Sequence, residues 1–167
     1  MSRIQYFIQN PLQLLYMLPA LLLGLTGDDP AFEGGEWPGE STKVKVAVDC
    51  FGPADLVGIV NSRPNMPLDD TSLFYALGGK NEQWKENLAK ISPVNYIVPG
   101  RELPPFLLLH GDADDVVDIA ESEVTYQKLL DNGYEADLVR VTGAPHEGNF
   151  WSQELLEIVF EFIQKHI

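Results

Sequence analysis

An apolar run that stops abruptly at a cluster of carboxylates is the feature that most constrains the fold of this chain. Residues 104–117 read PPFLLLHGDADDVV, so a stretch of strand length ends at Gly111 and acidic side chains follow at once. A buried strand that leads into a sharp polar loop is how open α/β sheets present side chains at their carboxyl edge. The stretch therefore predicts a central strand with Asp114 at that edge.

A second strand and polar loop follow one helix later. Residues 135–142 have strand character, and residues 143–148, which read GAPHEG, form the loop after it. Because a right-handed crossover places the ends of neighbouring parallel strands side by side, we expect Asp114 and His146 to meet there. A carboxylate in that place can accept the Nδ1 proton of the imidazole, as in a Ser-His-Asp relay. The pattern leaves a second interpretation open, in which each side chain is solvated or bonded locally.

The order of the other predicted elements is that of an α/β sheet. A helix ends at residues 27–30, and short helices are expected over residues 71–77 and 82–90. Residues 44–50 are rich in β-branched side chains, which is typical of a strand. Asp118 and Ser152 can each cap one of the last two helices, and Glu121, three residues after Asp118, would complete a capping box. Only three strands are visible, and three parallel strands form a small sheet with an exposed edge. The prediction is part of an α/β domain, with a parallel sheet flanked by helices.

Composition limits the partners of the chain. Its 167 residues suffice for one domain with a core, and its net charge of −14 argues against nucleic acid or an anionic membrane as a partner. Cys50 is the only cysteine, which excludes an intramolecular disulfide and a thiolate zinc cluster. Gln13 and Pro19 interrupt the apolar segment near the N-terminus, so a buried helix is favoured over a signal peptide. The sequence does not decide whether the protein is cytoplasmic or secreted.

Other polar residues near the predicted edge are weaker candidates. We expect His110 to satisfy local backbone groups rather than to react. Asp112, Asp115 and Asp118 lack the spacing of a calcium loop, so no metal or other cofactor is expected. We expect Cys50 to be a small buried apolar residue, although its place at a strand end does not exclude a role as nucleophile. Trp151 follows the histidine loop, where it either packs in the core or lines a pocket.

Four short blocks occur in a characteristic order: FGPADL at 51–56, ISPV at 91–94, PPFLLLHGDAD at 104–114 and GAPH at 143–146. Together they resemble the C-terminal half of an α/β-hydrolase of the BD-FAE/acetyl-esterase type, close to the prolyl-oligopeptidase-like esterases. The similarity divides the chain into an atypical N-terminal segment, 1–19, and the C-terminal part of an α/β-hydrolase domain, 20–167. It implies that Asp114 is the triad acid and His146 the triad base. The implied substrate is a small ester or an acylated carbohydrate, often carrying an acetyl or feruloyl group.

The chain departs from the pattern of this family at the nucleophile. The family's serine lies in a Gly-x-Ser-x-Gly elbow, whose serine position falls on Leu14 and whose glycine positions fall on Leu12 and Tyr16. Neither that motif nor a His-Gly-Gly oxyanion loop occurs anywhere in the sequence. A shortened or frame-shifted gene product would explain this, so the expected fold is α/β-hydrolase-like with its N-terminal half missing.

The expected function is serine-type hydrolysis of a carboxylic ester, impaired by the absence of the nucleophile. Two alternatives stay open. The chain can be a catalytically silent fragment or pseudoenzyme that binds a ligand or associates with itself through an exposed sheet edge. It can also be one half of a split hydrolase whose serine comes from a second polypeptide.

Overall fold

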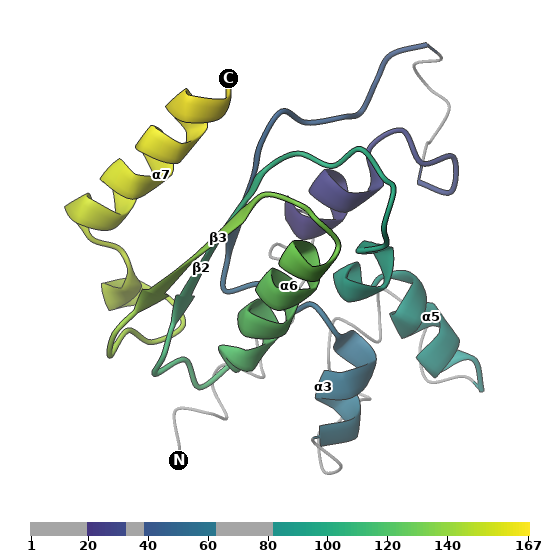
Figure 1. Cartoon of the computed structure of the whole chain (residues 1–167). Coiled ribbons are helices and arrows are strands. Elements are labelled where there is room, and N and C mark those ends of the chain that lie inside the picture. The colour runs from purple at the N-terminus through teal and green to yellow at the C-terminus, as the bar shows by residue number, and fades with distance from the viewer. Residues whose placement is uncertain (1–19, 33–38, 63–81) are drawn as a thin grey trace.

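The computed structural model describes residues 20–32, 39–62 and 82–167 (Figure 1). The helix expected over residues 71–77, the elbow position Leu14 and the segment 1–19 lie outside these residues. The described elements, in chain order, are a helix over residues 20–26, β1 (Ala47–Cys50), α3 (Leu56–Ser62), α5 (Trp84–Lys90), the 3-10 helix η2 (Pro93–Tyr96), β2 (Phe106–Gly111), α6 (Ala120–Asp131), β3 (Ala136–Val141), the 3-10 helix η3 (Gly148–Phe150) and α7 (Gln153–His166).

The three described strands form one parallel sheet in the order β1-β2-β3. In its register Phe106 pairs with Ala47 on one side and with Ala136 on the other. Every residue of β2 is buried, as expected for a central strand whose two faces are both covered. The apolar run of the sequence is therefore confirmed as the central strand.

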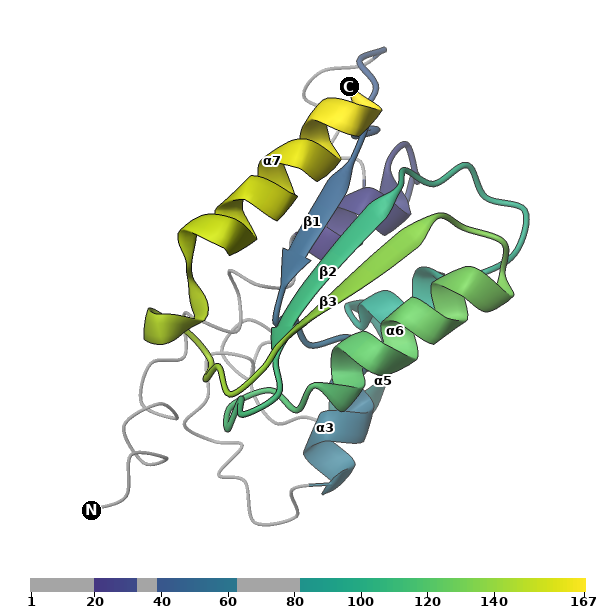
Figure 2. The ribbon, with the colours of Figure 1, turned by 60° about the vertical axis from the view of Figure 1, so that its left-hand side comes forward.

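The two faces of the sheet are covered by different helices (Figure 2). Successive side chains of a strand point to opposite faces. Accordingly, Phe106 and Leu108 pack in one core cluster with residues of the helix over 20–26 and of α6, whereas Leu107 and Leu109 pack in another with residues of α7. The prediction of a parallel sheet flanked by helices is thus confirmed.

The capping box predicted for Asp118 and Glu121 is not formed, because the N-cap of α6 is Ile119, with no side-chain cap hydrogen bond. Glu121 instead contacts the segment before α3, which begins at Leu56. The carboxylate of Glu121 accepts the backbone N–H groups of Ala54 (2.9 Å) and Asp55 (2.7 Å), so it serves the entrance to α3 and not a capping box on α6. At the chain end the prediction is confirmed, because Ser152 caps α7 by accepting the N–H of Leu155.

No helix of the described part combines the length and apolar character that would let it cross a membrane. The carboxyl ends of β1, β2 and β3 lie together at one edge of the sheet, since all three strands run in the same direction (Figure 2). The loops that leave this edge carry the candidate site.

Candidate active site

Asp114 and His146 meet at the carboxyl edge of the sheet. Asp114 lies in the loop after β2 and His146 in the loop after β3, and the imidazole Nδ1 is 2.7 Å from the carboxylate Oδ2. Both side chains are almost fully buried. The structure thus brings together the two residues that the sequence pattern paired, and their catalytic role stays a prediction.

Backbone bonds between the two loops hold this geometry. The N–H of Ala113 donates to the carbonyl of Ala144 at 3.1 Å, and the N–H of Asp112 donates to the carbonyl of Val141 at 3.2 Å. The Asp112 carboxylate in turn accepts the N–H of Gly143 at 2.6 Å. The loops therefore extend the pairing of β2 and β3 beyond the strand ends.

The carboxylate of Asp114 is surrounded by donors. Burial opposes its charge, but hydrogen bonds from His110 and His146 and from the N–H groups of Val117 and Val116 outweigh burial and hold the pKa of Asp114 well below its ordinary value. The two backbone bonds reach Oδ1 at 2.9 Å and 2.8 Å. A permanently ionised carboxylate at His146 Nδ1 is what stabilises an imidazolium during catalysis.

An aromatic cluster lies against the imidazole of His146. The ring of Phe51, at the end of β1, is 4.6 Å from the imidazole, centroid to centroid, and 4.8 Å from the ring of Phe150. Trp151 packs edge-on against Phe150 and is 44% exposed, so its ring borders both the core and solvent. Trp151 thus packs against Phe150 at the surface, and whether it lines a pocket stays a prediction.

The backbone is strained on both sides of this cluster. Phe51 has φ 47°, in the left-handed region that bulky residues rarely adopt. Glu147, directly after His146, has φ 111° and ψ −172°, a region almost confined to glycine. Such conformations cost ~1–3 kcal/mol each and cluster at functional sites. No local sequence pattern predicts Phe51 in the site, because its position depends on a turn that phenylalanine seldom makes.

The weaker candidates have structural partners. His110 is fully buried, with Nε2 2.9 Å from the carbonyl of Val117, as expected for a residue that satisfies local backbone groups. An oxygen of Asp118 accepts the N–H of Ala120 at 2.9 Å. Within the described ranges, no three His, Cys, Asp or Glu side chains are placed to hold a metal ion.

Within residues 20–32, 39–62 and 82–167, no alternative nucleophile stands out beside His146. Burial and then the charge of Asp49 raise the pKa of the Cys50 thiol to about 12, so the reactive thiolate is disfavoured. The serines of the described residues each bond elsewhere: Ser41 to Asp28, Ser62 to the carbonyl of Ile59, Ser92 to the carbonyl of Leu88, Ser122 to His110 and Ser152 to the N–H of Leu155.

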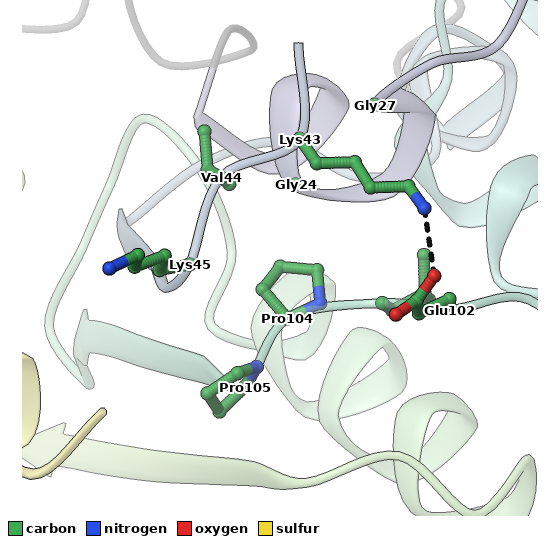
Figure 3. A pocket seen from close by; sticks show the side chains of 9 residues that line it. Gly24, Gly27, Lys43, Val44, Lys45, Glu102, Pro104 and Pro105 are labelled. Atoms are coloured by element: carbon green, nitrogen blue, oxygen red, sulfur yellow. Dashed lines mark hydrogen bonds and ion pairs between the residues drawn. The ribbon is translucent and has the colours of Figure 1, made fainter. Parts of the chain in front are cut away.

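A cavity of about 250 Å³ lies at the opposite edge of the sheet (Figure 3). Its lining comes from the segments that precede β1 and β2, including Lys43, Glu102 and Pro104. Two of the lining residues pair with each other, since Lys43 Nζ donates to Glu102 at 2.7 Å, and Lys45 points away from this pair (Figure 3). The cavity is thus separate from the Asp114–His146 pair.

The parallel sheet flanked by helices, with Asp114 and His146 at its carboxyl edge, is the fold of part of an α/β-hydrolase. The profile of the BD-FAE family matches residues 19–129, two thirds of the chain, and the chain belongs to this family. A structural neighbour, a truncated form of a carbohydrate esterase from gut microbiota, has a TM-score of 0.67 and 25% identity over 87% of this chain. Esterase 2 of Thermogutta terrifontis shares the fold, with a TM-score of 0.58 and 23% identity over 87% of the chain.

Relatives are similar over a limited part of their own length. Esterase LipQ of Mycobacterium tuberculosis is 29% identical over 126 residues, which cover 68% of this chain and 26% of that protein. The non-reducing polyketide synthase mapC of Penicillium roqueforti is 36% identical over 83 residues, 44% of this chain and 3% of that protein. The chain spans 55% of the carbohydrate esterase and 52% of the Thermogutta esterase.

Proposed function

We propose that this chain carries the acid–base pair of a serine-type carboxylic ester hydrolase. His146 is the general base, and Asp114 orients it. The observation that carries the proposal is the 2.7 Å hydrogen bond from His146 Nδ1 to the buried Asp114 carboxylate. This bond fixes the tautomer in which Nδ1 holds the proton, so that Nε2 is the atom that exchanges protons with the reactants.

In the reaction that this pair serves, a serine hydroxyl attacks the carbonyl carbon of the ester while Nε2 takes the hydroxyl proton. The tetrahedral intermediate collapses, the ester C–O bond breaks, and the alcohol leaves with the proton from Nε2. Water then attacks the acyl-enzyme with His146 again as base, and the carboxylic acid and the serine hydroxyl are released. Asp114 stays ionised throughout, which its depressed pKa supports.

We further propose that the substrate is a small ester or an acylated carbohydrate and that the activity of this chain is impaired. Membership of the BD-FAE family and the likeness to a carbohydrate esterase support the substrate class. The sequence lacks a Gly-x-Ser-x-Gly elbow and a His-Gly-Gly loop. Loss of a single oxyanion donor alone lowers turnover by ~10²–10³-fold in serine hydrolases.

Hydrolysis of p-nitrophenyl acetate by the purified chain tests the proposal. We expect any turnover to be far slower than that of a complete esterase, to be abolished by His146→Ala and to be strongly lowered by Asp114→Asn. His166→Ala is the matched control, because His166 bonds to Phe162 and Glu135, away from the site. A turnover that is indifferent to His146 would contradict the proposal. Labelling with a fluorophosphonate, followed by mass spectrometry, is expected to give no adduct, and an adduct on one serine would reveal a nucleophile outside the elbow motif.

A second candidate function is that of a catalytically silent module that associates with itself. The observation in its favour is the small sheet, in which, within the described residues, β1 and β3 each pair on one side only. Unpaired strand edges can pair with another chain. Complete absence of turnover, together with a mass that rises with concentration in light scattering, would favour this function.

Recovery of activity on co-expression with the upstream half of a related esterase would instead favour a split hydrolase.

A further inference from the structure

His110 is a second histidine on the same carboxylate as His146. It belongs to β2 and is fully buried. Its Nε2 is 2.9 Å from the carbonyl of Val117, and its Nδ1 is 2.7 Å from the hydroxyl of Ser122 on α6. A carbonyl can only accept a hydrogen bond, so Nε2 must carry the proton. In the neutral imidazole, Nδ1 then accepts from the Ser122 hydroxyl, which could pair with either tautomer, so the Val117 carbonyl is the partner that selects it.

The proton on His110 Nε2 also faces Asp114. The distance from this nitrogen to Asp114 Oδ2 is 3.3 Å, and Oδ2 is the same oxygen that lies 2.7 Å from His146 Nδ1. One carboxylate oxygen is therefore flanked by two imidazoles. The bond from His110 is the largest of the contributions that lower the pKa of Asp114 against its burial.

Val117 closes this arrangement into a ring of contacts. Its N–H donates to Asp114 Oδ1 at 2.9 Å, and its carbonyl accepts from His110 Nε2. The carboxylate thus has one oxygen held by backbone N–H groups and the other held by side chains. Since β2 and α6 fix His110 from both sides, the carboxylate plane has little freedom to rotate about its bond to Cβ.

We propose that His110, held in its Nε2–H tautomer by the carbonyl of Val117, is a positioning residue that aims the Asp114 carboxylate at His146. The chain of contacts is Ser122, His110, Asp114 and His146, and it runs from α6 through β2 to the loop after β3. His110 exchanges no proton with a substrate and acts only through Asp114. The inference rests on the proposed roles of Asp114 and His146.

Nitrogen-15 NMR of the histidine-labelled chain tests the proposal without any need for turnover. For the wild type we expect a protonated Nε2 and an unprotonated Nδ1 on His110, and a downfield Nδ1–H proton on His146. His110→Leu removes the donor, so the downfield proton of His146 should be lost. His110→Gln places an amide N–H near the former Nε2 and should restore that signal. Ser122→Ala should leave Nε2 of His110 protonated, because the carbonyl of Val117 still requires a donor, and should shift only the Nδ1 signal.

Two results would overturn the proposal. One is a wild-type His110 protonated on Nδ1 instead of Nε2, a result that depends on no variant. The other is a folded His110→Leu chain, checked by circular dichroism, that keeps the downfield proton of His146. If His110→Leu does not fold, the tautomer of His110 in the wild type decides, together with its retention in Ser122→Ala. A failure of ester hydrolysis in the wild type with these signals intact would overturn the proposed function and leave the positioning role standing.

Discussion

The backbone of Gly111 lies directly against the carbonyl of Ala144. A Cβ atom at position 111 would come within 2.2 Å of that oxygen, closer than atoms can approach. The same carbonyl accepts the N–H of Ala113 at 3.1 Å. The absence of a side chain at Gly111 therefore lets the loop after β2 approach the loop after β3 closely enough for Asp114 to reach His146.

Gly111→Ala should separate the two loops. We expect the free energy of unfolding to fall by ~1–3 kcal/mol, because the new methyl group meets backbone that has no room to move. Urea denaturation measures this loss. Gly133→Ala is the control, since a Cβ at Gly133 meets nothing within 4 Å and only its φ of 81° opposes the change, at ~1 kcal/mol. Equal losses for the two variants would show that the loops are not held tightly together.

The pairing of Asp114 with His146 could be predicted because it depends on local signals: an apolar strand that stops at a polar loop, twice, with one helix between. Other features depend on contacts that the sequence does not display. The expected strand over residues 44–50 is paired only from Ala47, opposite Phe106. Pro104 and Pro105, just before Phe106, have no N–H groups to extend the ladder.

The role of Glu121 shows the same limit. Its spacing from Asp118 is that of a capping box, yet its partners, the N–H groups of Ala54 and Asp55, are 67 and 66 positions away in the chain. The N–H groups of Ala54 and Asp55 precede α3 and have no acceptor within that helix. Because they are partly buried, they require an acceptor from elsewhere, and the Glu121 carboxylate supplies it. No local pattern encodes such a contact.

Glu121→Ala should destabilise the fold through α3. The substitution leaves the N–H groups of Ala54 and Asp55 without their carboxylate acceptor, and we expect a loss of ~2–3 kcal/mol in the free energy of unfolding. Glu123→Ala, two positions along α6, is the matched control, because Glu123 forms an exposed ion pair with Arg140 worth less than ~1 kcal/mol. A loss at Glu121 no larger than that at Glu123 would refute this role.

Asp49 should make stability depend on pH. It is 1% exposed, and burial raises its pKa to about 7, although the N–H of Gly52 and the nearby His110 oppose this shift. Because the folded-state pKa exceeds the unfolded value of about 4, the contribution of Asp49 to stability is fully present below pH 4 and is lost as the pH rises toward 7.

Asp49→Asn should remove this loss. Relative to the wild type, the variant is expected to gain stability between pH 4 and pH 7, by no more than about 4 kcal/mol, with no further change above pH 7. Urea denaturation across this pH range measures the difference. Asp137→Asn, at an exposed site on β3, is the control and should leave the pH profile as it is. A constant difference between wild type and Asp49→Asn at all pH values would contradict the prediction.

Cys50 should be inert in the folded chain, which bears on whether a thiol could take the place of the missing serine. Burial and then the charge of Asp49 raise the pKa of its thiol to about 12, so only ~10⁻⁴ of the thiol is ionised at pH 8, against roughly a quarter for a free cysteine. We expect Ellman's reagent to react at least ~10³-fold more slowly with the folded chain than with the chain in urea. A cysteine at the exposed position of Ser62, in a Cys50→Ala background, should react quickly in both states. Rapid labelling of Cys50 in the folded wild type would contradict this prediction and make the thiol a candidate nucleophile for His146.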